Sequence, residues 1–106
     1  MTIKRKDIRN FVSFAMTVAT GAGRILRQGF RRPLTVKYKG RIDPVTQYDL
    51  KSERYIVESI ARLFPDHSIL SEEGRDKDVP GGFCWVVDPL DGTVNYAHRF
   101  PVYCVS

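Results

Sequence analysis

Two aspartates, Asp88 and Asp91, stand three residues apart directly after an apolar segment and together could bind a divalent cation. Residues 85–87 predict a buried strand, and Pro89 and Gly92 predict a tight turn after it. Two carboxylates about 4 Å apart repel by roughly 4 kcal/mol at an effective dielectric of about 20, unless a cation lies between them. Because carboxylate oxygens are hard ligands, the pair favours Mg²⁺.

The same residues also fit a purely structural interpretation. Asp and Gly are common in turns, so Asp88 could cap the strand while Asp91 and Gly92 form an ordinary turn. A short motif is only a hypothesis until further residues support it. The spacing by itself therefore leaves a metal site and a structural turn both open.

The elements that position these aspartates follow from the spacing of the apolar residues. Periods of three and four predict a long amphipathic helix over residues 6–30 and a second helix from Val45 or Thr46 to Pro65. A polar loop is expected over residues 75–82. The expected strands are short and lie at residues 34–38, 67–71, 83–87 and 100–106. This order predicts an α/β fold with helices layered on a mixed sheet.

The composition and charge bound the class of protein. The chain has 106 residues, 42% hydrophobic and 27% charged, which is typical of one globular domain. Residues 1–41 carry eleven Lys and Arg against one Asp, a net charge of +10, whereas residues 42–106 carry six against eleven Asp and Glu, a net charge of −5. The basic half (residues 1–41) could attract a phosphorylated substrate, an acidic membrane or nucleic acid, although a solvated helix face is the commoner meaning.

The cysteines and the N-terminus bear on the compartment. Cys84 and Cys104 lie in apolar strand-like segments and are expected to be small buried residues rather than a disulfide or a zinc site. A reducing, cytoplasmic location fits this pattern. The uncharged segment 11–23 superficially suggests a signal peptide, but Asp7 interrupts its approach and its apolar positions have a helical period. No segment is long and apolar enough to span a bilayer.

A longer motif makes the metal site specific. Asp88-Pro-Leu-Asp-Gly-Thr-Val-Asn-Tyr96, followed by His98-Arg99-Phe100-Pro101, resembles the signature of the inositol monophosphatase family of Mg²⁺-dependent phosphatases. The resemblance covers nearly all of the chain but only the first part of the family members. It implies that residues 1–106 are the N-terminal portion of an α/β domain of the sugar-phosphatase type. Since members are commonly dimers, it also implies a homodimer at full length.

The resemblance extends the metal site to further residues. Glu72, the first acidic residue of Ser71-Glu72-Glu73-Gly74, is implied as a metal ligand, although an adjacent acidic pair alone is usually just solvated. Glu72, Asp88 and the Leu90 carbonyl would bind one Mg²⁺. Its coordinated water would attack phosphorus, aligned by Glu72 and Thr93. Asp88 and Asp91 would share a second Mg²⁺ that steadies the leaving alkoxide.

Asp49 has two interpretations that can coexist. The pattern Thr46-x-x-Asp49 before an apolar-periodic segment predicts a capping box at the start of the second helix. The resemblance adds that Asp49 helps to hold a weaker, third Mg²⁺. It also implies a lysine that approaches this region from just upstream. Lys39 is the best match, although the intervening loop is one residue shorter here.

The residues after the aspartates are expected to contact the substrate phosphate. Gly92 and Thr93 predict the start of a helix whose free amides would bind phosphate, with Gly92 permitting close approach. A plain threonine cap is the alternative for Thr93. The full set of expected substrate contacts is Glu72, Leu90, Asp91, Gly92 and Thr93. Structural hydrogen bonds are expected instead from Asn95, His98 and Arg99.

These residues predict hydrolysis of a phosphomonoester by positioning and charge neutralisation, without a covalent nucleophile. The resemblance favours inositol 1-phosphate, with fructose-1,6-bisphosphatase, histidinol-phosphatase and nucleotide phosphatase as alternatives. Residues that grip the inositol ring, and a further metal-binding aspartate, lie in the C-terminal part of the family, so these residues alone could be inactive. A different class, a binding module for RNA or an acidic partner, would use the basic half. No membrane partner is expected.

Overall fold

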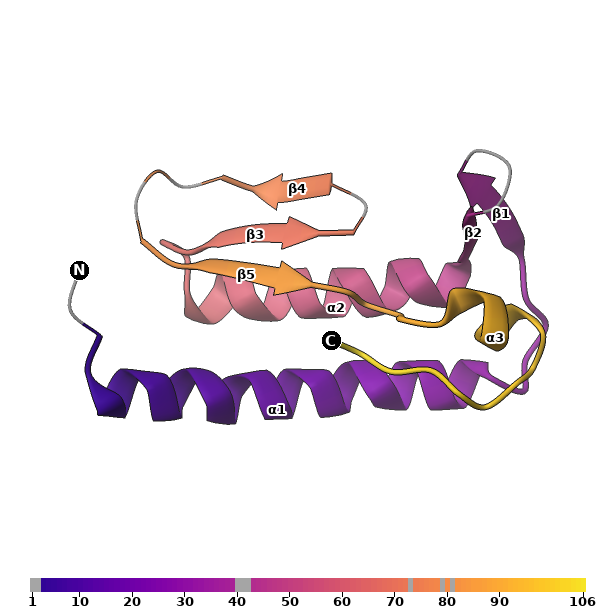
Figure 1. Ribbon diagram of the computed structural model, residues 1–106, viewed down its shortest axis with the longest axis horizontal. Coiled ribbons are helices and arrows are strands. Elements are labelled where there is room, and N and C mark those ends of the chain that lie inside the picture. Colours follow the sequence, from indigo (N-terminus) through magenta and orange to yellow (C-terminus); the bar gives the residue numbers. More distant parts are fainter. Residues whose placement is uncertain (1–2, 40–42, 73, 79, 81) are drawn as a thin grey trace.

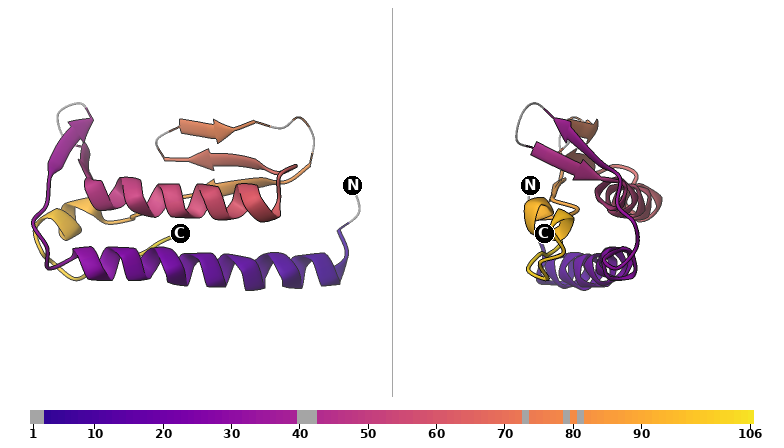
Figure 2. Two further views of the ribbon diagram at one scale, coloured as in Figure 1. Left: turned by 180° about the vertical axis from the view of Figure 1, so that it is seen from behind. Right: turned by 90° about the vertical axis from the view of Figure 1, so that its right-hand side faces the viewer.

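The computed structural model describes residues 3–39, 43–72, 74–78, 80 and 82–106, without the side chains of residues 39, 43 and 74–77. Two long helices run antiparallel beside a small sheet, and a hairpin and a short helix lie at one end (Figures 1 and 2). The elements are α1 (Arg5–Gly29), β1 (Val36–Lys39), β2 (Asp43–Thr46), α2 (Gln47–Leu63), β3 (Ser68–Ser71), β4 (Gly74–Lys77), β5 (Cys84–Val87) and α3 (Thr93–Ala97). The predicted α/β fold is confirmed.

The two long helices bury their apolar sides against each other and against the sheet. The main core consists of residues from α1, α2, β3 and β5, namely Val18, Ala22, Ile56, Ile60, Ile69 and Val87. The spacings of four within each helix place these side chains on one face, as the periodicity predicted. Across the described residues, no helix has both the length and the hydropathy that a bilayer crossing requires.

The three-stranded sheet is mixed and has the order β4-β3-β5. β3 pairs with β4 antiparallel and with β5 parallel, in a register that sets Ser71 opposite Val87. β1 and β2 form a separate antiparallel hairpin. Because β3 and β5 are parallel, the chain leaves both strands at the same edge of the sheet (Figure 1).

A second core cluster joins α3 to the C-terminal end of α1. It contains Leu26, Tyr48, Leu90 and Tyr96, and the buried hydroxyl of Tyr96 donates a hydrogen bond to the Leu26 carbonyl at 2.7 Å. Burial raises the pKa of the Tyr96 hydroxyl, and the nearby tyrosines raise it further. The guanidinium of Arg99 donates to the carbonyls of Phe30 and Arg32, just past α1. These contacts fix α3 on the end of α1.

Two strand predictions and one loop prediction were wrong in part. The strand expected over 34–38 lies at Val36–Lys39, and its partner β2 was missed. The expected polar loop over 75–82 contains most of β4, which carries no apolar alternation and forms through backbone pairing with β3. Residues 100–106 form no described strand, only a bridge between Cys104 and Asp91. The apolar pattern predicts which residues favour extended structure, but pairing needs a partner that the pattern does not specify.

The expected burial of the two cysteines was also wrong. Cys84 and Cys104 are both exposed, and neither is in a disulfide. Successive residues of a strand point to opposite faces, and in β5 it is Trp85 and Val87 that face the core. Cys84 therefore points outward, on the same face of β5 as Val86, which is 74% exposed.

The Tyr96 hydroxyl gives a stability prediction. We expect Tyr96→Phe to lower the free energy of unfolding by about 1 to 2 kcal/mol, because it leaves the Leu26 carbonyl buried without its donor. The measurement is urea unfolding followed by circular dichroism. Tyr38→Phe is the matched control, since that side chain is 61% exposed, and should change the stability by less than about 0.5 kcal/mol. Equal losses in the two variants would contradict the role of the buried hydrogen bond.

Candidate functional site

The candidate site begins where the two parallel strands end side by side. Ser71 and Val87 are paired at the ends of β3 and β5, and the next residues along the chain are Glu72 and Asp88. The structure thus brings two of the predicted ligands to one edge of the sheet, from positions sixteen residues apart in the sequence. Glu72 is exposed, and Asp88 is partly buried. Carboxyl ends of parallel strands are a common place for ligand sites in α/β proteins.

The turn after β5 is fixed by its own hydrogen bonds and by one buried side chain. The Leu90 amide donates to Asp88 Oδ1 at 3.3 Å, and the Leu90 side chain is only 1% exposed. Gly92 has a φ of 92°, and a Cβ atom there would lie 3.0 Å from the Val102 carbonyl oxygen. The turn therefore requires glycine at position 92 for its backbone conformation as well as for space. α3 begins at the next residue, as predicted.

The buried carboxylate of Asp49 connects the start of α2 to the end of this turn. Its Oδ2 accepts from the Thr46 amide at 2.9 Å and from the Thr46 hydroxyl at 2.6 Å. Its Oδ1 accepts from the Thr93 hydroxyl at 2.9 Å. The predicted capping box of Thr46 and Asp49 is confirmed. A carboxylate has about four acceptor positions, so these three hydrogen bonds leave room for a further contact. The predicted part of Asp49 in a third metal site stays a prediction.

Two further side chains of α2 reach the site, and their role there was not predicted from the sequence. The buried Ser52 hydroxyl donates to the Pro89 carbonyl at 2.7 Å. Glu53 Oε2 accepts from the Ser71 hydroxyl at 3.1 Å, at the end of β3. One signal was available, because Ser52 is a polar residue at a position where the helical period predicts burial. Its partner, a carbonyl 37 residues away, could not be read from the sequence.

The last residues of the chain pair with the turn. The amide and carbonyl of Asp91 exchange hydrogen bonds with Cys104, and those of Asp88 exchange hydrogen bonds with Ser106. The Cys104 thiol lies 3.8 Å from Asp91 Oδ2. Partial desolvation raises the pKa of this thiol, and the Asp91 carboxylate raises it further. Backbone pairing thus holds both predicted aspartates, and α2 contacts the same turn at Pro89 and Thr93.

The donor chemistry of the site fits a hard divalent cation. Asp91 and Glu72 are exposed carboxylates, Asp88 is partly exposed, and all three offer the oxygen ligands that Mg²⁺ prefers. In the part of the chain that the structure describes, no group of three or more His, Cys, Asp or Glu side chains is placed so that it could hold a metal ion. The side chain of Lys39 lies outside the described residues. The ligand roles of these residues therefore stay predictions.

The remaining predicted residues take up structural positions around the turn. Thr93 donates from its hydroxyl to Asp49 and also lies 3.1 Å from the Leu90 carbonyl oxygen. The Asn95 amide donates to the Val102 carbonyl at 2.9 Å, and His98 Nδ1 lies 2.8 Å from the Val94 carbonyl oxygen. Together with the Arg99 contacts above, these are the structural hydrogen bonds expected for the residues after the motif.

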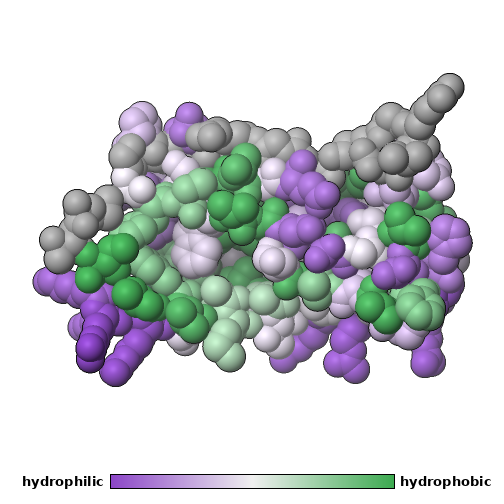
Figure 3. Space-filling view, in the orientation of Figure 1, coloured by the Kyte–Doolittle hydropathy of each residue, from purple (hydrophilic) through white to green (hydrophobic). Residues whose placement is uncertain are grey.

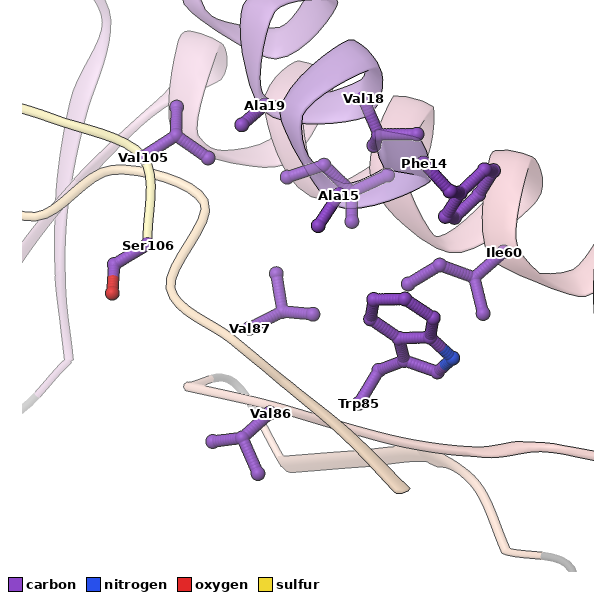
Figure 4. A pocket seen from close by; sticks show the side chains of 11 residues that line it. Phe14, Ala15, Val18, Ala19, Ile60, Trp85, Val86, Val87, Val105 and Ser106 are labelled. Carbon is purple, nitrogen blue, oxygen red and sulfur yellow. The ribbon is translucent and has the colours of Figure 1, made fainter. Parts of the chain in front are cut away.

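An apolar cavity of about 160 Å³ lies away from the carboxylates, between α1, α2 and β5. Trp85 and Val87 point toward it and toward α1, whereas Val86 lies on the other side of the strand (Figure 4). Hydrophobic side chains gather on this face of the molecule (Figure 3). A phosphate ester needs polar or charged partners when it leaves water, so this apolar lining does not suit it. The edge of the sheet that carries Glu72, Asp88 and Asp91 is the better candidate site.

Comparison with known proteins gives a consistent picture. Residues 7–106 match the model of the inositol monophosphatase family. The chain is 41% identical over 102 residues to inositol-1-monophosphatase of Synechocystis sp., covering 94% of the chain and 36% of that protein. It superposes on the suhB extragenic suppressor protein of Bartonella henselae with a TM-score of 0.81 and 32% identity, over 91% of this chain and 38% of that one.

A second solved structure agrees with the first. Inositol monophosphatase from Anabaena (Nostoc) sp. matches with a TM-score of 0.75 and 37% identity, over 94% of this chain and 34% of that one. The chain therefore spans little more than a third of the length of the relatives that it matches. The family match over residues 7–106 includes Glu72, the turn after β5, all of α2 and α1 from its third residue.

The Asp49 carboxylate gives a second stability prediction. We expect Asp49→Ala to lower the free energy of unfolding by about 2 to 3 kcal/mol, because it removes together the Asp49 half of the capping box of α2 and the hydrogen bond from Thr93. Chemical unfolding measures the loss. Asp66→Ala, at an exposed position between α2 and β3, is the control and should stay within about 0.5 kcal/mol of the parent. An Asp49→Ala loss no larger than that of the control would rule out this structural role.

Proposed function

The chain belongs to the inositol monophosphatase family, and from that premise we propose that it contributes the metal-binding edge of a Mg²⁺-dependent phosphomonoester hydrolase. One observation carries the proposal. The parallel register of β3 and β5 sets Glu72 and Asp88 at adjacent strand ends, beside the turn that carries Asp91. A phosphoryl group in transfer is highly anionic, so a site of this kind works by holding cations and the reacting groups in place.

We assign the metal ligands residue by residue. Glu72, Asp88 and the Leu90 carbonyl would hold one Mg²⁺, Asp88 and Asp91 would hold a second, and Asp49 would contribute to a third. Bound Mg²⁺ supplies charge neutralisation at the phosphoryl oxygens and lowers the pKa of a coordinated water. The turn supports this assignment, because backbone hydrogen bonds at Asp88 and Asp91 hold both aspartates in place. The basic residue Lys39 would approach the same region.

Thr93 is assigned to the attacking water. Its single hydroxyl proton is used to donate to Asp49 Oδ1 or to the Leu90 carbonyl oxygen, so a lone pair of the Thr93 oxygen remains to accept a hydrogen bond from a water. Glu72 would accept the other proton of that water, which fixes the water in line with phosphorus. Asp91, Gly92 and Thr93 would contact the substrate phosphate.

We take inositol 1-phosphate as the substrate, in keeping with the name of the Synechocystis relative. The whole protein would be a homodimer. A cytoplasmic location is consistent with the two exposed cysteines, neither of which forms a disulfide, because exposed thiols of this kind persist in a reducing compartment.

A phosphatase assay tests the proposal. We expect phosphate release from inositol 1-phosphate to require Mg²⁺ and to fall by about a hundredfold or more in Asp88→Asn, which removes a negative ligand shared by two ions. Asp66→Asn removes an equal charge at an exposed position outside the site and should leave the rate unchanged. Fructose 1,6-bisphosphate, histidinol phosphate and a nucleotide, assayed in parallel, define the substrate class.

Calorimetry with Mg²⁺ on the same proteins separates binding from turnover. Uptake of Mg²⁺ that is lost in Asp88→Asn supports the metal assignment whether or not these 106 residues turn over substrate. The proposal fails if the parent chain takes up no Mg²⁺. Salt-sensitive RNA binding that Asp88→Asn leaves unchanged would instead indicate a binding module that uses the basic half.

A further inference from the structure

We propose that Ser52 is a positioning residue that holds the Asp88–Asp91 turn in the geometry required for cation binding. The inference rests on the proposed function and assigns a role to a residue outside the motif. Ser52 lies on α2 and is completely buried, with an exposed fraction of 0%. Its hydroxyl donates a 2.7 Å hydrogen bond to the carbonyl of Pro89, in the middle of the turn.

The direction of this hydrogen bond distinguishes Ser52 from an ordinary helical serine. Serine hydroxyls inside helices often bond the carbonyl four residues earlier in the same helix. Ser59, two turns further along α2, does this with the Tyr55 carbonyl at 2.6 Å. The Ser52 hydroxyl instead leaves its own helix for a carbonyl 37 residues away in the chain. The Ser52 hydroxyl therefore links α2 to the turn after β5, whereas a bond within the helix would link no second element.

The anchored carbonyl lies between the two predicted ligands of the turn. Asp88 immediately precedes Pro89, and Asp91 follows it by two residues. Proline has a fixed φ and no amide hydrogen, so the position of its carbonyl depends on the rotation of the peptide that leads to Leu90. Holding the Pro89 carbonyl therefore fixes the direction in which the chain continues through Leu90 to Asp91.

The neighbours of Ser52 on α2 show that this side of the helix serves as a frame for the site. Asp49, one turn earlier, accepts from Thr93 at the far end of the turn. Glu53, the next residue, accepts from Ser71 at the end of β3, just before Glu72. Of these three contacts, that of Ser52 reaches the segment between Asp88 and Asp91. Mg²⁺ demands a nearly fixed ligand geometry, so small rotations of this segment should weaken its binding.

The test compares Ser52→Ala with Ser59→Ala, because each removes one hydroxyl from the same helix. Mn²⁺, a paramagnetic stand-in for Mg²⁺, is titrated into the 106-residue chain and its affinity is read by electron paramagnetic resonance. We expect about tenfold weaker Mn²⁺ binding in Ser52→Ala and no change in Ser59→Ala, as is usual when the support of a metal ligand is lost. Thermal unfolding of both variants shows whether a loss of stability alone explains the loss of Mn²⁺ affinity.

A second readout needs no metal. Hydrogen exchange of the Leu90 and Asp91 amides, which donate to Asp88 Oδ1 and to the Cys104 carbonyl, should speed up in Ser52→Ala and stay unchanged in Ser59→Ala. If Ser52→Ala does not fold, Ser52→Cys fills a similar space with a weaker donor and allows the same comparison.

The outcomes separate this inference from the proposed function. If Asp88→Asn weakens Mn²⁺ binding while Ser52→Ala leaves both affinity and amide exchange unchanged, the positioning role is wrong and the metal site stands. If the parent chain binds no Mn²⁺, the proposed function fails and this role fails with it. Weaker binding with faster exchange, confined to the Ser52 variant, supports the inference.

Discussion

The site depends on one buried carboxylate that belongs to neither strand. Asp49 accepts hydrogen bonds from the amide and hydroxyl of Thr46 and from the hydroxyl of Thr93, so a single side chain both completes the capping box of α2 and holds the end of the turn after β5. A buried carboxylate is costly unless donors surround it, and here the donors come from two segments that are 47 residues apart. The start of α2 and the site are therefore stabilised by the same interaction.

The second constraint is the parallel pairing of β3 with β5. In an antiparallel pair the residues after the two strands would leave at opposite edges, and Glu72 would lie far from Asp88. The parallel register sets them side by side, and α2, packed against the same strands through Ile56 and Ile60, carries the side chains that contact the strand ends. In this chain a small mixed sheet and one helix together build the edge that carries Glu72, Asp88 and Asp91.

Much of this was predictable because it follows from local patterns. The helices were expected within one or two residues of their ends, since the apolar periods and the Thr46 capping box are local properties. β4 was missed because Gly74–Lys77 has no apolar alternation and forms only by pairing with β3. Cys84 was predicted buried because an apolar run does not say which of its two faces meets the core. Its neighbour Trp85 does so instead.

The sequence by itself determined the helices, the α/β class, the turn that carries Asp88 and Asp91, and the family. These depend on residue type and on spacings of a few positions, which act locally. Tertiary structure alone decided the register that brings Glu72 beside Asp88, the tie from Asp49 to Thr93, and the hydrogen bond from Ser52 to the Pro89 carbonyl. Each of these joins groups far apart in the chain, and such contacts exist only once the strands and helices have packed.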